Sequence, residues 1–144
     1  MQLKFNIVRI VSKIHGYIYR ASGGRMGKNL GRQEILLLTT TGRKSGKKRS
    51  VPLAAINYEG RYLVVASFGG SPVHPAWFLN IRDNSVVQIR LGAVILQANA
   101  SIIEKTNSIY EELWDKAVDT YQGFDSYKKA TTRNIPIVVL EPVY

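Results

Sequence analysis

The stretch Glu34–Pro52, EILLLTTTGRKSGKKRSVP, decides the fold prediction and carries the main candidate for a binding site. Four apolar residues and three threonines run into Gly42, a pattern that predicts a buried strand ending in a loop. The following positions 43–49 hold five cations in seven residues. Flexible glycines, a hydroxyl, free backbone N–H groups and clustered cations together are typical of a loop that binds an anion. The sequence therefore predicts an anionic ligand beside this strand.

The loop does not follow the phosphate-binding pattern G-x-x-x-x-G-K-[ST], because Gly46 follows Gly42 one residue too early. An alternative stays open: the segment is a basic hairpin turn whose charges are simply solvated. The density of cations directly after an apolar strand favours the ligand.

The composition of the whole chain narrows the class of protein. The 144 residues are enough for one domain with a single core. The chain has no cysteine and only two histidines, which excludes thiolate chemistry and argues against a metal site. A net charge of +10 predicts a polyanionic partner such as nucleic acid, an anionic membrane surface or a multiply charged cofactor. No apolar run of membrane-spanning length and no signal-peptide pattern occur, so a cytoplasmic location is expected.

The first segment, residues 3–20, has apolar residues at steps of three and four with cations largely between them. This spacing predicts an amphipathic helix. Two compatible alternatives stay open: the helix packs on the domain, or it lies peripherally on the inner face of an anionic membrane.

Turn residues predict two hairpins, at 50–58 with 61–67 and at 87–91 with 94–102, and a final strand at 135–140. The arm at 62–66 is almost wholly apolar and is expected to be covered on both faces, whereas the second hairpin has the period-two alternation of strands with one buried face. A short helix is expected at 74–80. A capping box at Ser108–Glu111 predicts a helix to about residue 121, with Ile109, Leu113, Ala117 and Val118 inside, and 122–133 forms a further helical or irregular piece. About six antiparallel strands with flanking helices predict a small β-barrel, in one α+β domain over residues 1–144.

The short helix at 74–80 contains an aromatic pair with a polar residue on either side. Trp77 and Phe78 are either core aromatics or part of a site. Asn80 needs hydrogen-bond partners, since it is an amide in an aromatic helix. His74 is expected to begin the helix and not to act as a catalyst.

Four ordered motifs resemble the deazaflavin-dependent nitroreductase family over roughly residues 7–142. They are LLTTTGRKSG (37–46), ASFGG (66–70), HPAWFLN (74–80) and IPIVVLEP (135–142). The resemblance implies a split β-barrel of the FMN-binding type that uses coenzyme F420, an 8-hydroxy-5-deazaflavin with a phosphate and an oligoglutamate tail. It also implies an oxidoreductase that passes a hydride from the reduced cofactor to a quinone, an activated enone or a nitroheterocycle.

The resemblance assigns residues to the two ends of the cofactor. The acidic tail is expected at the basic loop and its continuation, namely Arg43, Lys44, Ser45, Gly46, Lys48, Arg49 and Ser50. The flat ring is expected along Val51, Pro52, Leu53, Ala66, Ser67, Phe68, Ala76, Trp77, Phe78, Leu79 and Asn80. The candidate catalytic residues are Ser67, as a hydroxyl contact to the acceptor, and Phe124 and Tyr127 beside the substrate. No metal is expected.

Three positions depart from the family pattern. Phe124 stands where a tyrosine is common, which keeps a stacking ring but removes a hydroxyl that Tyr121 or Tyr127 could replace. Phe68 replaces a frequent lysine and makes the cleft more apolar. Lys48 replaces a frequent proline and adds charge beside the tail.

Three alternatives to an F420-dependent reductase stay open. A non-catalytic protein of the same fold could hold F420 or a lipid, and Phe124 and Phe68 motivate this possibility. An FMN oxidoreductase could use a similar barrel. A nucleic-acid-binding barrel is suggested by charge alone. The chain lacks the interleaved aromatic and basic residues expected on a face that stacks bases, which argues against this alternative. A monomer and a homodimer are both compatible with the sequence.

Overall fold

The computed structural model describes residues 29–30 and 33–144. In chain order its elements are β1 (Asn29–Leu30), β2 (Gln33–Thr41), β3 (Lys48–Tyr58), β4 (Arg61–Val65), the 3₁₀ turn η1 (Phe68–Gly70), α2 (Ala76–Asp83), β5 (Val86–Leu91), β6 (Val94–Ile103), α3 (Tyr110–Thr120), α4 (Gly123–Lys129) and β7 (Ile137–Val143). The amphipathic helix predicted at 3–20 lies outside the described residues, so that prediction and the single domain over 1–144 stay predictions. None of the described helices is long and apolar enough to cross a membrane.

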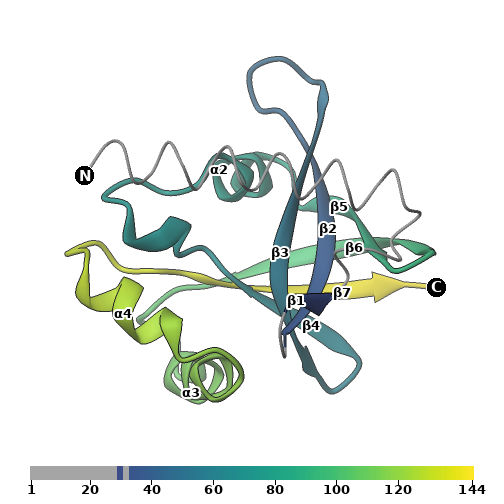
Figure 1. The fold of residues 1–144 in the computed structure, drawn as a ribbon. Coiled ribbons are helices and arrows are strands. Elements are labelled where there is room, and N and C mark those ends of the chain that lie inside the picture. The colour runs from purple at the N-terminus through teal and green to yellow at the C-terminus, as the bar shows by residue number, and fades with distance from the viewer. Residues whose placement is uncertain (1–28, 31–32) are drawn as a thin grey trace.

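The strands form a closed antiparallel barrel (Figure 1). Hydrogen bonding follows the order β1-β2-β3-β4-β7-β6-β5, and β5 also pairs with β2. This last pairing closes a ring of six strands and leaves the two-residue β1 as an appendage on β2. The expected barrel of about six antiparallel strands is confirmed.

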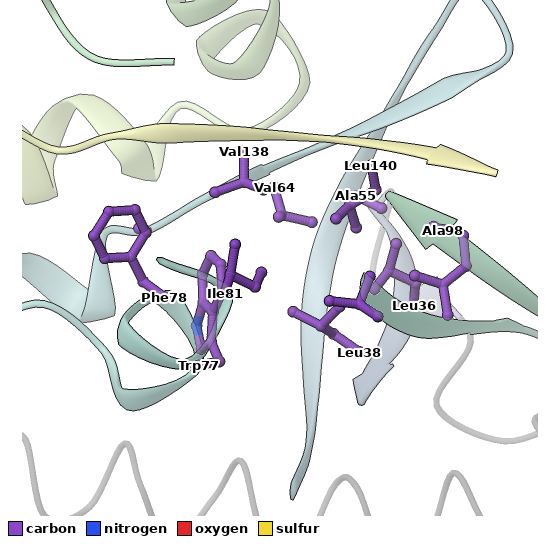
Figure 2. Close-up of a cluster of buried hydrophobic side chains, with 13 residues drawn as sticks. Leu36, Leu38, Ala55, Val64, Trp77, Phe78, Ile81, Ala98, Val138 and Leu140 are labelled. Carbon is purple, nitrogen blue, oxygen red and sulfur yellow. The ribbon is translucent and has the colours of Figure 1, made fainter. Parts of the chain in front are cut away.

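The inside of the barrel is filled by the first of two apolar clusters (Figure 2). All six ring strands contribute to it, for example Leu36 from β2, Val64 from β4 and Leu140 from β7. Helix α2 adds Trp77, Phe78 and Ile81, which Figure 2 shows beside the strands. Of the two alternatives for Trp77 and Phe78, the structure supports a place in the core, since both are buried, while their assignment to the cofactor site stays a prediction.

A second cluster lies on the other face of β4, where α3 and α4 pack (Figure 1). Along β4 the side chains alternate, so Leu63 and Val65 belong to this cluster while Val64 belongs to the first. The strand is therefore covered on both faces, as its continuous apolar sequence predicts.

The prediction of a capping box at Ser108 was wrong. No side chain caps α3, and the Asn107 Oδ1 atom instead accepts a hydrogen bond from the Ile109 N–H at 3.1 Å. The inner face of the helix differs accordingly: Ile109 is exposed, whereas Tyr110 and Trp114 are buried. An Asx turn competes with a cap for the same backbone groups, and the sequence pattern does not distinguish the two.

Candidate functional site

The basic loop lies at the rim of the barrel, at the end of the β2–β3 hairpin (Figure 1). β5 pairs with β2 only over Leu37–Thr39, while β3 accompanies β2 as far as the pair Thr41 and Lys48. The hairpin thus extends beyond the closed ring and presents residues 42–47 outside it.

Hydrogen bonds within the loop fix its shape. The Gly42 N–H donates to the Lys47 carbonyl and the Gly46 N–H to the Gly42 carbonyl, both at 2.8 Å. The Lys47 N–H donates to Ser45 Oγ at 3.1 Å. Gly46 has φ +70°, a conformation that favours glycine. The prediction of free backbone N–H groups was therefore wrong for most of this loop, and an anion here must be held mainly by side chains.

The cationic side chains of the loop are exposed and have no acidic partner in the part of the chain that the structure describes. Residues 43–50 are all exposed, and no carboxylate of the described residues pairs with the five cations. The Lys48 Nζ atom donates to Thr41 Oγ1 at 3.0 Å, which orients that lysine along the hairpin. A second hydroxyl pair, Thr39 Oγ1 with Ser50 Oγ at 2.8 Å, joins the two strands just below.

Asn80 attaches helix α2 to the base of this loop. Its side-chain Nδ2 donates to Thr40 Oγ1 at 3.0 Å, and its Oδ1 accepts from the Arg43 N–H at 3.1 Å. Asn80 and Thr40 are both buried. The predicted need of this amide for partners is confirmed, and the partners are the strand end and the first residue of the basic run.

Beside the loop, β3 offers a half-buried apolar strip formed by Val51, Pro52 and Leu53. Val51 and Leu53 pack against the first cluster, which contains Trp77. Leu79 also packs there, while Ala76 is exposed at the start of α2. The structure thus brings the basic loop, the apolar strip and α2 to the same end of the barrel.

The segment after β4 carries the candidate Ser67. Ala66 continues the strand through a bond from its N–H to the Pro136 carbonyl at 3.0 Å. Ser67 is buried, and its carbonyl accepts bonds from the Gly70 N–H and from Arg133 Nη2, both at 2.9 Å. Phe68 follows with φ +45°, an uncommon conformation for a bulky residue.

The candidates Phe124 and Tyr127 lie on α4. Phe124 is buried in the second cluster, on the other face of β4 from the cluster that contains Trp77. Tyr127 is half-buried and shares a hydrogen bond of 3.1 Å with the hydroxyl of Tyr121. Burial, followed by this bond, raises the pKa of Tyr127 to about 12, so its phenol is neutral near pH 7.

Helix α4 packs closely on the turn that follows Ser67. A Cβ atom on Gly70 would come within 2.8 Å of the Ala130 Cβ and 3.0 Å of the Tyr127 carbonyl, and Gly70 also has φ +80°. Only glycine fits both the conformation and the space. The backbone of Tyr127 is therefore adjacent to the Ser67 turn, whereas the Phe124 ring is directed into the second cluster.

A family model described as "F420H(2)-dependent quinone reductase" matches residues 11–142. The chain belongs to this family. A quinone reductase of this description from Mycobacterium tuberculosis is 34% identical over 130 residues, covering 89% of this chain and 87% of that protein. The resemblance drawn from the four motifs is confirmed, and with it an oxidoreductase family that uses reduced F420, in preference to FMN.

Solved structures agree with this assignment. A structure described as an F420-H2 dependent reductase is 40% identical, covers 74% of this chain and 93% of its own, and has a TM-score of 0.65. A chain described as a domain-swapped dimer is 34% identical, covers 97% of both chains and has a TM-score of 0.70. A heme storage protein from Vibrio cholerae, at 15% identity and a TM-score of 0.61, shares the fold alone.

Two residues that the sequence did not single out contribute to the candidate site. Thr40 is the buried partner of Asn80, and Arg133 bonds to the carbonyls of the Ser67 segment. Thr40 is one of three successive threonines, and Arg133 is one of 20 cations, so neither stands out along the chain.

Proposed function

We propose that this protein is a reductase that transfers a hydride from reduced F420 to a quinone. The proposal rests on one observation: five exposed cations and a half-buried apolar strip lie together at one end of the barrel. The cations have no acidic partner among the described residues, and Asn80 joins the base of their loop to helix α2.

The charges fit the acidic end of the cofactor. F420 carries a phosphate and several carboxylates, and a charge-assisted hydrogen bond contributes about 1.5–3 kcal/mol. Arg43 and Lys44 follow immediately after the loop's first glycine, and Lys48 and Arg49 lie on the returning arm of the hairpin, paired with Thr41 and Thr40. Since the N–H groups of Gly42, Arg43, Gly46 and Lys47 already have partners, the cationic side chains supply most of the contacts, with Ser45, Gly46 and Ser50 shaping the hairpin around them.

The apolar strip fits the flat ring. When bound, the reduced deazaflavin supplies the hydride, so the protein has only to orient two ring systems and exclude water. Val51 and Leu53, which alternate with Pro52 along β3, provide the wall, and they pack against the cluster that contains the buried Trp77 and Phe78. Ser67 and the backbone around Phe68 lie along the ring in this arrangement, where the serine hydroxyl donates to the acceptor as negative charge develops on it.

The range of acceptors is a finer part of the proposal. Tyr121 and Tyr127 share a hydrogen bond, and the backbone of Tyr127 is adjacent to the Ser67 turn. The hydroxyl whose proton is not used in that bond can donate to a carbonyl or nitro oxygen. We therefore include activated enones and nitroheterocycles as acceptors. An apolar quinone partitions into membranes, so peripheral contact of residues 3–20 with the inner membrane face belongs to the same proposal.

Titration of the purified protein with F420 tests the site. Replacing Arg43→Ala together with Lys44→Ala is expected to weaken binding by roughly 100-fold or more, the equivalent of two charge-assisted contacts. The matched control is Arg61→Ala with Lys129→Ala, which removes one exposed arginine and one exposed lysine elsewhere and should leave affinity unchanged. Equal affinity in the two double variants would overturn the site.

Turnover separates a reductase from a carrier protein. Oxidation of reduced F420 in the presence of menadione, followed by its absorbance, is expected to require the protein. Tight binding without turnover of any quinone, enone or nitroheterocycle would support the non-catalytic alternative.

A further inference from the structure

Arg133, in the connection between α4 and β7, uses every N–H of its guanidinium. The five contacts are Nε to the Ser71 carbonyl at 2.8 Å, Nη2 to the carbonyls of Ala66 at 3.1 Å and Ser67 at 2.9 Å, and Nη1 to the Asn134 carbonyl at 3.4 Å and to His74 Nδ1 at 3.2 Å. Four of the five partners belong to residues 66–74, which lie about 60 residues earlier in the chain.

This guanidinium is half-buried, and no carboxylate among the described residues pairs with it. Burial lowers its pKa from the usual value, but an arginine stays charged. The charge is thus compensated by four backbone carbonyls and the His74 ring nitrogen. A partly buried charge without an acidic partner depends on these contacts, because losing one would leave an N–H desolvated and unpaired.

The contacts also set the direction of two peptide groups. Every described peptide bond is trans, so the N–H of Ser67 points opposite to the Ala66 carbonyl, and the N–H of Phe68 points opposite to the Ser67 carbonyl. Because Arg133 attracts both carbonyls, both N–H vectors are directed away from Arg133. The left-handed conformation of Phe68 is held by the same clamp, since it lies between Ser67 and Ser71.

We propose that Arg133 is a positioning residue, which orients the Ser67 segment toward the acceptor by clamping the carbonyls of Ala66, Ser67 and Ser71 from behind. This inference rests on the proposed function for its catalytic consequence, but the clamp itself is a property of the protein alone. The planar fork is essential to it, because the single ammonium group of a lysine cannot reach three separated carbonyls and a ring nitrogen at once.

The test compares Arg133→Lys, which keeps the charge, with Arg133→Met, which removes it, and uses Arg61→Lys and Arg61→Met as matched surface controls. Both Arg133 variants are expected to lower kcat with menadione by about 10- to 100-fold, since small misplacements of reacting groups cost that much. The Kd for F420 should stay close to that of the unaltered protein, because the basic loop is untouched. Amide exchange should rise at Gly70 and Ser71, whose N–H groups bond within the clamped turn, but not at Gly42 and Gly46 in the basic loop.

Wild-type kcat in an Arg133→Lys protein that is folded and binds F420 would overturn the inference while leaving the proposed function intact. So would unchanged exchange at Gly70 and Ser71. A loss of F420 affinity equal to the loss of kcat would also contradict it, because that result places Arg133 in cofactor binding. Failure of the unaltered protein to bind F420 would instead defeat the proposed function, and the exchange measurement would still decide whether the clamp exists.

Discussion

The two faces of β4 pack against two apolar clusters that differ in their surroundings. On the face toward the barrel interior, the cluster containing Trp77 borders an exposed polar rim, and α2 is joined to that rim by the hydrogen bonds of Asn80. On the other face, α3 and α4 close over a cluster rich in aromatic residues, among them Tyr110, Trp114 and Phe124. The first cluster borders exposed cations that pair with no carboxylate among residues 33–144, whereas the second cluster is covered by helices. In the proposed arrangement the cofactor lies at the end of the barrel that the first cluster borders, and the buried aromatic residues of the second cluster provide stability.

The largest expected effect is a loss of folding stability without a loss of F420 affinity, from a substitution in the second cluster. Leu113→Ala removes a fully buried side chain from the second cluster and should lower the free energy of unfolding by about 2–5 kcal/mol. Chemical denaturation measures this loss. At a temperature where the variant is folded, its affinity for F420 should equal that of the unaltered protein; a parallel loss of affinity would remove the distinction between the two faces.

Asn80→Leu should affect both properties, since Asn80 joins the core to the loop. The buried Thr40 hydroxyl loses its partner and the Arg43 N–H is released, at a cost of about 1–3 kcal/mol in stability. F420 affinity should fall by roughly tenfold as the loop loses its fixed position. The control is Asn84→Leu at the exposed end of α2, which should change affinity little. Unchanged affinity in Asn80→Leu would show that the loop does not depend on α2.

Phe124→Tyr tests whether the position that departs from the family pattern contacts the substrate. The ring is buried in the second cluster, so an added hydroxyl should lower stability by about 1–3 kcal/mol without raising turnover. Tyr127→Phe, which removes the hydroxyl bonded to Tyr121, is the companion variant and should lower turnover, because in the proposed function this phenol pair donates to the acceptor. A clear gain of activity in Phe124→Tyr would place that ring at the site.

The smallest effect is a dependence on pH. Burial, followed by the charge of Arg133, lowers the pKa of His74 from its ordinary 6.5; Arg82 acts in the same direction and Glu104 opposes it. The unfolded chain therefore binds a proton more readily than the folded one, and stability should fall as pH drops below about 6.5. Thermal unfolding between pH 7.5 and 5 measures this slope, and His74→Gln, which keeps an acceptor for Arg133 but does not titrate, should reduce it. An identical slope in that variant would assign the pH dependence to other groups.

The sequence predicted the barrel and the basic loop because both depend on local patterns. Alternation of apolar residues marks the hairpins, and five neighbouring cations after a strand mark the loop. The rest depends on contacts between distant residues. Asn80 and Thr40 are 40 positions apart in the sequence, and Arg133 and Ser67 are 66 positions apart. No spacing rule relates such pairs. The internal hydrogen bonding of the loop and the Asx turn before α3 were missed because several turn types share the same residues.

The most direct test of the central claim is a binding cycle that changes the ligand and the loop together. Isothermal titration would compare F420 with its deazaflavin chromophore lacking the phosphate and glutamates, in the unaltered protein and in Arg43→Ala with Lys44→Ala. If the basic loop holds the acidic tail, the double variant should lose most of the advantage of F420 over the chromophore, while affinity for the chromophore itself stays the same. Equal losses for both ligands would contradict the account, because the loop would then act on the ring or on the fold and not on the tail.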